Sequence, residues 1–539
     1  MYKKQPSVNV HQFAMVPKAD IPRSSFRRQS THKTTFDAGY LVPVYLDEVL
    51  PGDTFNLKMT AFARMATPIF PVMDNMYLDS FFFFVPNRLV WDNWVRFMGE
   101  QDNPADSISY SVPSFATSAA DFLTGSVYDY FGLPGPNQIT SNVTKVSVLP
   151  LRAYNLIWNQ WFRDENLQNS VTVRKTDAGD AYADFTLLRR GKRHDYFTSS
   201  LPWVQKGNTS VTLPLGTTAP IKGLGLPNPH LAGASISSNL ETQGSRTMPF
   251  GVSVGGAGLM NLEVASASTT ALPLIFADLS AATAATINQI RQAFQIQKLL
   301  ERDARGGTRY TEIVRAHFGV MSPDARLQRA EYLGGGSSPV NIHTITQNTQ
   351  TGLTGGTTPI GTVSGAATVT AHHGFTQSFT EHGHVIGLVA VRADLTYQQG
   401  IRKMWRRSTR YDFYFPVFAS LGEQAILQSE IFATGVQASD DTVFGYQERW
   451  AEYRFLPSQV SGLFRSTASG TIDSWHLAQK FTVAPTLNTT FIQDTPPVSR
   501  VVAVGAGANG QQFIFDSFFD IKTARCMPTY SVPGLVDHF

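Results

Sequence analysis

A run of apolar residues at Phe81–Val85 is the clearest pattern along the chain, because every position in it is large and apolar. Successive side chains of a strand point to opposite faces, so a strand here carries bulky side chains on both sides. Strands of this kind occur where both faces of a sheet are covered. Pro86 ends the run, since proline has no backbone N–H to donate. The pattern predicts a strand buried on both faces, inside a sandwich or a tight assembly.

Alternating patterns predict strands of another kind on either side of a turn. Residues 36–49 read as extended segments, in which Pro43 is tolerated only at a sheet edge or a bend. Leu50–Asp53 has the composition of a turn. Residues 54–64 then alternate apolar and polar positions, which is typical of a strand with one buried face.

Three segments carry apolar residues at helical spacing. Residues 90–98 place four apolar side chains on one face, and Gly99 follows where a helix C-terminus favours glycine. The same spacing recurs in residues 151–162. It recurs again in residues 284–305, and Gly306 ends that pattern. We therefore expect helices at these three places.

Strand patterns dominate the C-terminal half. Residues 384–397 contain an almost unbroken apolar run, and residues 411–418 are aromatic on both faces, so both predict strands. Gly505–Gly510 matches the glycine spacing of a dinucleotide-binding turn. That site requires a helix next, whereas residues 511–519 read as a strand. A glycine-rich hairpin loop is the expected structure there.

Two long segments differ in composition from the rest. Residues 208–280 contain only five charged and two aromatic residues, and residues 334–371 contain none of either kind. Loops of this length are uncommon in compact domains and are normally functional or disordered. We expect surface excursions, partly strand-like, that neighbouring copies order; for the second segment a disordered linker is the alternative.

Other short motifs give weak chemical signals. Gly251–Gly255 matches the nucleophile elbow around Ser253, but glycine-rich sequence follows where that motif requires a helix. Four histidines crowd beside Glu381, namely His372, His373, His382 and His384. Two of them share a strand face, but no second cluster supplies the ligands that define a metal site. Histidines at an interface or surface are the favoured interpretation.

Composition points toward extensive subunit contacts. The chain has 539 residues, of which 16% are charged and 12% aromatic. Interface centres are enriched in aromatic residues and depleted in charge, although a large Phe-rich enzyme would also fit. Cys526 is the only cysteine, so no intrachain disulfide is possible and a reducing compartment is favoured. Without a signal peptide or an apolar stretch of membrane-spanning length, we expect a soluble protein made in a cytoplasm.

Positive charge is concentrated at the N-terminus and in two clusters. Residues 1–35 carry a net charge of +6, and the remaining residues sum to −3. One cluster comprises Arg189, Arg190, Lys192 and Arg193. The second comprises Arg402, Lys403, Arg406, Arg407 and Arg410, interleaved with Trp405. Cations beside an aromatic ring suit single-stranded nucleic acid, and pairing with acidic residues across subunit interfaces is the alternative. We favour pairing for the first cluster and leave both readings open for the second.

Several long blocks resemble one family closely, the major capsid proteins of Microviridae, in particular the gokushovirus group. The blocks are VPKADIPRSSF at 16–26, FARMATPIFPVMDN and FFFFVPNRLVWDNWVRFMGEQ within 62–101, LRAYNLIWNQWFRDENLQ at 151–168, RRGKRHDYFTSSLPWVQKG at 189–207, the segment 287–337, RADLTYQQG at 392–400 and VPGLVDHF at 532–539. They span nearly the whole chain in order, while the two low-complexity segments do not match.

The resemblance implies a mainly β protein, an eight-stranded antiparallel jelly roll with long inserted loops and a few helices. It further implies about sixty copies in a T=1 icosahedral shell around a circular single-stranded DNA genome. Its expected partners are an internal scaffolding protein, a small basic DNA-packaging protein and a host surface receptor. The protein would be part of the virion, assembled in the host bacterial cytoplasm, with no catalytic residue, cofactor, metal or membrane insertion.

We expect four parts along the chain. They are a basic arm at 1–35, a jelly-roll core at 36–207 and 281–539, an insertion at 208–280 that protrudes at the threefold axes, and a variable loop at 334–371. The predicted DNA-facing residues are Lys3, Lys4, Arg23, Arg27, Arg28, Arg402, Lys403, Trp405, Arg406, Arg407 and Arg410. The predicted assembly core is Phe81, Phe82, Phe83, Phe84, Trp91 and Trp94.

Net charge limits the role of the chain in neutralising DNA. A charge of +3 per copy gives about +180 for about sixty copies, which is small beside one charge per phosphate of a genome. Cations or a separate basic protein must supply the remainder. The alternative function is an enzyme, either a hydrolase that uses Ser253 or a carbohydrate-active β-sandwich. A receptor-binding module acting outside a shell is a third interpretation.

Overall fold

A computed structural model describes most of the chain. The described residues are 21–115, 122–135, 146–207, 221–223, 275–277, 287–321, 328–349, 360–504 and 511–530. The chain divides into two compact units. The larger unit comprises Met1–Val204 and Gly306–Phe539, and the smaller unit is Gln205–Arg305.

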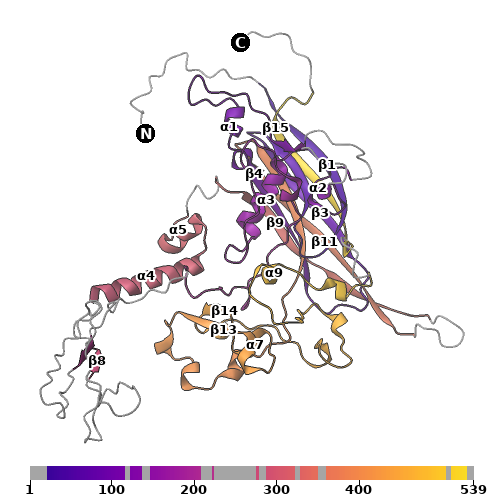
Figure 1. Cartoon of the computed structure of the whole chain (residues 1–539). Helices are drawn as coiled ribbons and strands as arrows, with labels where there is room; N and C mark the ends of the chain where they lie inside the picture. The colour runs from indigo at the N-terminus through magenta and orange to yellow at the C-terminus, as the bar shows by residue number, and fades with distance from the viewer. Residues whose placement is uncertain are drawn as a thin grey trace, which may run out of the picture. The chain divides into compact units, whose positions relative to one another are not determined.

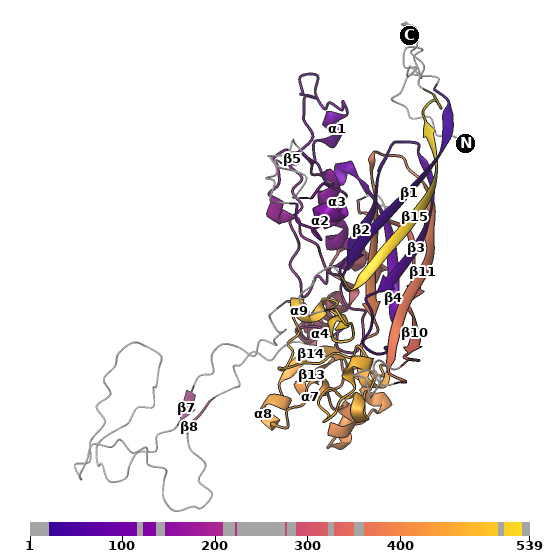
Figure 2. The same ribbon diagram turned by 90° about the vertical axis from the view of Figure 1, so that its right-hand side faces the viewer.

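Two antiparallel sheets form a sandwich in the larger unit (Figures 1 and 2). One sheet contains, in spatial order, β1 (Arg23–Phe36), β15 (Phe513–Cys526), β3 (Thr54–Met65), β11 (Val363–Ser378) and β10 (Asn341–Thr346). The other contains β2 (Val42–Val49), β12 (Gly383–Ala393), β4 (Met76–Pro86) and β9 (Glu331–Pro339). The mainly β, antiparallel fold expected from the sequence is confirmed.

The strand order agrees with a double-sheet jelly roll, but the count differs. In the described residues the two sheets contain nine strands, where the resemblance implied eight. β10 is the additional strand, at the edge of the five-stranded sheet. The other eight divide four and four. Along the chain, every connection between them crosses from one sheet to the other except that from β4 to β9, which is how a jelly roll closes its two sheets.

The five-stranded sheet has one buried face, as the alternating pattern predicted. β3 places Phe55, Leu57 and Met59 in the core between the sheets, while the residues between them are exposed. β15 does the same with Phe513 and Phe515. The strand expected in residues 511–519 is confirmed; Gly505–Gly510 lies outside the described residues.

Pro43 lies where the sequence analysis expected it, on an edge strand. β2 is the outermost strand of its sheet and pairs only with β12 among the described strands. The register shifts between Gly387 and Leu388, so that Tyr45 and Pro43 become consecutive partners on β2. A proline that cannot donate is tolerated at such an edge and irregularity.

A helical layer covers the outer face of the four-stranded sheet (Figure 2). It lies between β4 and β9 in sequence and contains η2 (Asn87–Leu89), α1 (Trp94–Phe97), β5 (Ser114–Phe115), α2 (Val127–Tyr130), β6 (Val146–Ser147), α3 (Leu149–Ile157), the π-helical turn η3 (Trp158–Phe162) and η4 (Tyr182–Asp184). The helix expected in residues 151–162 is confirmed as α3 and η3. Side chains of α3 pack against β4 and β12 in a second core cluster.

The helix expected at 90–98 is much shorter than its pattern suggested. Only Trp94–Phe97 is α-helical, because the N–H of Asp92 donates to the carbonyl of Lys175 (2.9 Å) instead of to a helical partner. Gly99 follows with a φ of +105°, as expected at a helix end.

A second subdomain follows β12 and contains mostly short elements. They are η6 (Lys403–Arg406), η7 (Arg410–Asp412), η8 (Pro416–Phe418), β13 (Glu423–Leu427), α7 (Gln428–Ile431), α8 (Gln437–Asp440), β14 (Val443–Glu448), η9 (Ala451–Tyr453), η10 (Gly462–Phe464), η11 (Asp473–Trp475), α9 (Thr489–Ile492) and η12 (Val498–Arg500). The strand predicted in residues 384–397 is confirmed by β12, which is buried at every position.

The strand predicted at 411–418 is wrong. The segment forms two 3-10 turns, η7 and η8. The carboxylate of Asp412 accepts hydrogen bonds from the N–H groups of Ser408 (3.0 Å) and Thr409 (2.7 Å), which closes a turn. Pro416 then begins the next turn. Local side-chain to backbone bonds thus outweighed the β-propensity of the aromatic residues.

Strands extend into the expected arm and into the second low-complexity segment, which was expected to be partly strand-like. Residues 23–35 of the expected arm lie in β1, which pairs with β15 along its whole length. Much of the expected loop 334–371 lies in β9, β10 and β11. Gly335 permits this, because a Cβ there would clash with the carbonyl oxygen of Ser80 on β4. Low side-chain bulk here allows close strand pairing.

The smaller unit is described at a few elements only. β7 (Ile221–Gly223) pairs with β8 (Ile275–Ala277), both within the predicted insertion. The helix expected at 284–305 is confirmed as α4 (Ile287–Gly306), the red helix of Figure 1. In the larger unit, α5 (Tyr310–Phe318) follows and ends at Gly319, which has a φ of +70°. The four-part division of the chain stays a prediction.

Candidate functional site

The aromatic run lies in β4, an inner strand of the four-stranded sheet, and its two faces enter different cores. Phe82 and Phe84 lie in the core between the sheets, with ring centroids 5.4 Å from Phe375 and 4.6 Å from Phe379. Phe83 lies in the core under the helical layer, 5.5 Å from Trp161. The strand predicted to be buried on both faces is confirmed.

The chain itself covers these rings. Phe82, Phe83 and Phe84 are at most 6% exposed, and Phe81 contacts Phe162 of η3 at 5.2 Å. Trp91 is fully buried and donates its indole N–H to Asp177 (2.6 Å), and Trp94 packs against it. A tight assembly is therefore not needed to explain the apolar run. Its role in assembly stays a prediction, and it would act by fixing the shape of the subunit.

Asp79 anchors a buried ion cluster on the same strand. Its carboxylate accepts from Arg190 (2.5 Å) and from Arg392 of β12 (2.9 Å). Burial by itself would raise the pKa of Asp79, but the hydrogen bond from Ser337 and the two guanidinium charges outweigh it and lower the pKa. The cluster ties β4, β12 and the segment that carries Arg190 together. A buried charge in an otherwise apolar strand needs such partners. The position of Asp79 beside the apolar run was therefore the sequence signal for a buried ion pair.

Three members of the first basic cluster, Arg189, Arg190 and Lys192, also have partners within the chain. Arg189 lies 3.8 Å from the ring of Tyr40 and donates to the carbonyl of Asp494 (3.2 Å). Burial lowers the pKa of Lys192 to about 8. Burial likewise raises the pKa of Asp494 to about 6, against the opposing effect of the nearby cations. The partners lie within the chain, whereas the sequence analysis expected them across interfaces.

The second basic cluster has internal partners as well. Arg407 pairs with Glu452 (3.0 Å), Arg406 pairs with Asp441, and Lys403 donates to the carbonyl of Ala425 (2.8 Å). Arg402 donates to the carbonyl of Pro457 (3.1 Å), and Arg410 lies over the ring of Phe415. Trp405 between them is 75% exposed. Contact of this cluster with DNA stays a prediction.

An apolar surface surrounds this cluster. We call it the aromatic surface; its exposed members are Met404, Trp405, Tyr411, Phe413, Tyr414, Val417, Leu421, Tyr453 and Leu456. Val417 and Leu456 are more than 80% exposed. Tyr414 and Tyr453 lie 6.3 Å apart, which joins the two chain segments. Large exposed apolar patches rimmed by polar residues mark interaction sites.

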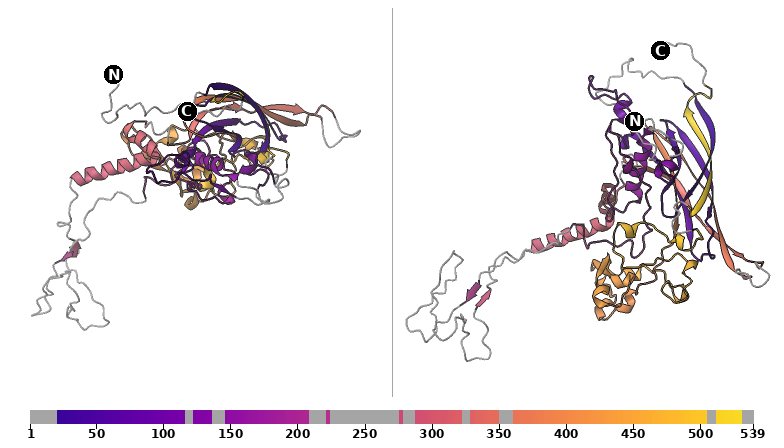
Figure 3. Two further views of the ribbon diagram at one scale, coloured as in Figure 1. Left: turned by 90° about the horizontal axis from the view of Figure 1, so that it is seen from above. Right: turned by 45° about the vertical axis from the view of Figure 1, so that its right-hand side comes forward.

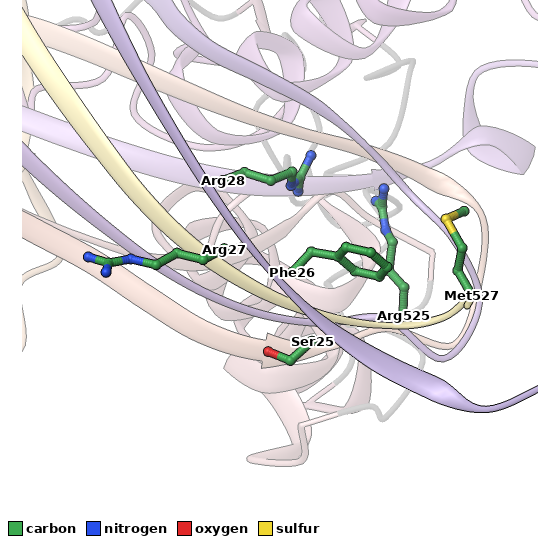
Figure 4. A pocket seen from close by; sticks show the side chains of 6 residues that line it. All are labelled: Ser25, Phe26, Arg27, Arg28, Arg525 and Met527. Carbon is green, nitrogen blue, oxygen red and sulfur yellow. The ribbon is translucent and has the colours of Figure 1, made fainter. Parts of the chain in front are cut away.

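The cations predicted in the arm lie on β1, apart from Lys3 and Lys4, which are outside the described residues. Arg27 pairs with Asp520 at 2.9 Å on the outer face, and Arg23 bonds to the carbonyl of Gly52. Arg28 points into the sandwich and pairs with Asp47. An open pocket of about 400 Å³ at this end of the sandwich is lined by Ser25, Phe26, Arg27, Arg28, Arg525 and Met527 (Figure 4).

The pocket has no excess positive charge with which to hold a phosphate. Figure 4 shows Arg28 and Arg525 extending to the same side, whereas Arg27 extends away from them. Arg28 is neutralised by Asp47, and Arg525 is paired with the buried Asp53 at 2.9 Å. Both guanidinium groups also lie over the ring of Phe55. These arginines therefore hold this end of the sandwich together, and the pocket is not a binding site for phosphate.

The histidines do not form a metal site. No group of three or more potential ligands comes together in the part of the chain that the structure describes. His373 bonds to the hydroxyls of Ser80 (2.6 Å) and Ser338 (3.1 Å), which joins the two sheets. His384 is buried in β12, and burial lowers its pKa to about 4. The expectation of interface or surface histidines is therefore wrong for His384, which is buried, and His373 is bound between the two sheets. Ser253 lies outside the described residues.

The sequence matches a known family over nearly all of its length. A family model described as "Capsid protein (F protein)" matches residues 14–535. The chain belongs to this capsid protein family. It is 46% identical to "Capsid protein VP1" of Bdellovibrio phage phiMH2K, over 98% of this chain and 99% of that protein. It is 42% identical to "Capsid protein VP1" of Chlamydia phage 1, over 99% of each chain. Identity to "Capsid protein VP1" of Spiroplasma virus 4 is 34%, over 99% of this chain and 100% of that protein.

Membership of the capsid protein family decides the class of function. The protein is a structural component of a phage virion and not an enzyme, which confirms the resemblance and rejects the hydrolase and carbohydrate-active alternatives. None of the helices in the described residues is long and apolar enough to cross a bilayer. The site of a capsid protein is its set of contact surfaces. The sequence patterns indicated the cations of the aromatic surface, but they predicted a strand for its aromatic residues at 411–418.

Proposed function

We propose that about sixty copies of this chain assemble into a T=1 icosahedral shell that encloses a circular single-stranded DNA genome. The family supports a capsid that surrounds a genome, and the aromatic surface supports contacts between copies. Internal scaffolding and basic packaging proteins belong to the proposal as partners, since +3 per chain leaves most of the DNA charge unneutralised.

The observation that carries the proposal is the exposure of the aromatic surface. Its rings and aliphatic side chains lie in water in a single subunit, and three of the five cations among them, Lys403, Arg406 and Arg407, are already paired with carboxylates of the chain. Burying apolar area with satisfied charges at its rim is what a stable protein interface requires. The surface therefore suits a neighbouring copy better than it suits a phosphate backbone.

The test is to produce the full chain and to examine the product by negative-stain microscopy and sedimentation. Wild-type protein should yield uniform particles of megadalton size. The triple variant Trp405→Ser/Val417→Ser/Leu456→Ser should remain folded by circular dichroism but yield unassembled subunits. Tyr310→Ser on α5, which alters a side chain that is 79% exposed, is the matched control and should assemble normally. Normal particles from the triple variant would remove the aromatic surface from the interface.

Host attachment is assigned to the insertion 208–280. Its low charge and its position within a unit separate from the sandwich support this assignment. Exchange of residues 224–274, the stretch between β7 and β8, for a short Gly/Ser linker should leave particle yield unchanged and abolish adsorption to host cells. Unchanged adsorption would assign attachment to another surface, for which the segment that connects β10 and β11 is the next candidate.

Contact of the basic arm with DNA can be tested without disturbing the sandwich. Removal of residues 1–35 would delete β1 and open a sheet edge, so the informative truncation is residues 1–20. The truncated protein should form particles that contain less DNA, measured as the ratio of absorbance at 260 and 280 nm. Full DNA content would exclude a role for Lys3 and Lys4.

A further inference from the structure

The outer face of the five-stranded sheet is uncovered in the subunit. Its inner face enters the core, whereas its outward side chains lie in water, with no described element of the larger unit packed over them (Figures 2 and 3). The helical layer lies on the other side of the sandwich, over the four-stranded sheet. We call this uncovered surface the open face; it consists of the outward positions of β1, β15, β3, β11 and β10.

The open face carries an excess of positive charge. Its cations are Arg23, Arg27, Lys33, Lys58, Arg64 and Lys522, and its carboxylates are Asp516 and Asp520. Six cations against two carboxylates give a net charge of +4, more than the +3 of the whole chain. Lys58, Arg64 and Lys522 form no ion pair with the residues that the structure describes. Asp520, which lies opposite Lys58 in the register and is influenced by the charge of Lys522, is itself paired with Arg27.

Two exposed phenylalanines lie among these cations. Phe62 of β3 is 46% exposed and Phe518 of β15 is 40% exposed. In the register of the two strands Phe62 is opposite Asp516 and Phe518 is opposite Thr60, so the two rings are diagonal neighbours. Such neighbours lie about 7–8 Å apart on one face. On β3, Lys58 lies before Phe62 and Arg64 lies after it, both on the same face of the strand. On β15, Lys522 follows Phe518 on that face.

We propose that the open face binds the single-stranded DNA inside the shell, with bases stacked on Phe62 and Phe518 and phosphates held by Lys58, Arg64 and Lys522. Cationic grooves with aromatic platforms bind single strands without sequence preference, because every base has a flat face that can stack. This inference rests on the proposed enclosure of DNA and names the surface that contacts it. It differs from the aromatic surface, where three of the five cations are already paired with carboxylates.

Charge argues for a nucleic acid rather than a second copy of the chain as the occupant. Interface centres between proteins are depleted in charged residues, but the open face has charged positions in each of three adjacent strands. Two copies meeting through this face would bring like net charges together. A polyanion with exposed flat rings matches both the charge and the phenylalanines.

Unassembled wild-type subunits are tested first against a fluorescein-labelled 20-nucleotide oligodeoxythymidine by anisotropy at several salt concentrations. The slope of log K against log salt concentration should be less steep by about 2 in the variant Lys58→Gln/Arg64→Gln/Lys522→Gln, because each of the three lost cations contributes about 0.7 to the slope. Phe62→Ala/Phe518→Ala should weaken binding at least about fivefold and leave the salt dependence unchanged. Phe62→Trp should bind normally and show indole fluorescence quenched by the bound strand.

Matched controls lie elsewhere on the surface. Lys175→Gln/Arg193→Gln/Lys298→Gln removes three exposed cations that form no ion pair with described residues, and Phe318→Ala removes a ring that is 77% exposed. Both controls should bind the oligonucleotide as the wild type does. Equal losses in controls and open-face variants would show diffuse binding and overturn the proposal.

Particle assays separate this inference from the proposed function. Open-face variants should form particles with reduced DNA content. Loss of particles in folded open-face variants would show that another copy covers the face, and full DNA content with unchanged oligonucleotide affinity would show that DNA does not contact it. Either result overturns the proposal. A wild-type chain that forms no particles would instead contradict the proposed shell.

Discussion

The two sheets of the sandwich meet the same core but differ in what lies outside them. The four-stranded sheet is covered by α3 and its neighbours, so β4 and β12 are buried on both faces. The five-stranded sheet has an open face, and its strands alternate buried and exposed positions. One sheet is thus fixed in place within the subunit, whereas the other presents a surface.

This difference assigns the two sheets to different tasks. The covered sheet gives the subunit its shape, since the side chains of β4 and β12 cannot reach a neighbour or a genome without unfolding. The open face has charges and rings that serve no purpose in the fold, because exposed pairs and rings contribute little to stability. Substitutions should therefore be costly in β4 and β12 and nearly neutral to folding at the outward positions of β3 and β15, where their effects should appear in binding.

The largest effect is expected for Phe83→Ser in β4. Removing a ring that is 1% exposed leaves a cavity and a buried hydroxyl, and should lower the free energy of unfolding by about 4 kcal/mol. Urea titration of the unassembled subunit measures this, and no particles should form. Phe62→Ser on the open face is the control and should change stability by less than about 1 kcal/mol. Similar losses in both variants would contradict the proposed division between the sheets.

The next effect in size is expected for Arg392→Met. Asp79 would keep Arg190 but lose a buried partner at 2.9 Å, so its charge would be incompletely compensated. Breaking a buried pair costs about 3 kcal/mol, measured again by urea titration. Adding Asp79→Asn should recover part of this loss, because the amide carries no charge. A loss below about 1 kcal/mol would mean that water or Arg190 alone compensates the carboxylate.

A smaller effect should appear as a dependence on pH through His384. Burial lowers its pKa from an ordinary value of about 6.5 to about 4 in the folded chain, against a small opposing effect of Asp47. The unfolded chain therefore binds a proton first as the pH falls. Stability from the neutral ring is complete above pH 6.5 and is lost as the pH falls toward 4, by about 2 kcal/mol at pH 5.

Thermal unfolding at pH 7 and pH 5 checks this expectation. His384→Leu should reduce the difference in melting temperature between the two pH values. His372→Leu on the open face is the control and should leave that difference as in the wild type, because an exposed ring is hydrated in both states. If the difference in melting temperature between pH 7 and pH 5 were unchanged in His384→Leu, protonation of carboxylates would be the cause of the acid sensitivity.

The sequence predicted the covered sheet better than the surfaces. The run at Phe81–Val85 and the segment 384–397 have only one way to avoid water, so their burial followed directly from the pattern. Residues 411–418 have the same aromatic character, but Asp412 and Pro416 form local turns, and the rings stay exposed in a single copy. The pattern of apolar residues in a sequence indicates that a side chain must be covered. It does not indicate whether the same chain or a neighbouring copy covers it.

The charge pattern of the sequence showed where some of the cations gather, but it did not show which carboxylates pair with them. The cations of residues 23–35 and 402–410 were noticed in sequence, whereas their carboxylate partners lie far along the chain, as Asp520 does from Arg27. Pairing over such distances depends on strand register. Lys58, Arg64 and Lys522 formed no cluster in sequence and come to one face only because β3 and β15 are neighbours.

The smallest effect is expected for Lys33→Met on the open face. Lys33 pairs with Asp516 across β1 and β15, but the two side chains are 71% and 46% exposed. Exposed pairs contribute between 0 and about 1 kcal/mol, so urea titration should show a loss within that range, smaller still at 1 M salt than at 0.1 M. A loss as large as that of Arg392→Met would mean that a second copy or another segment covers Lys33. In that case the five-stranded sheet would be covered on both faces, and the contrast between the two sheets would disappear.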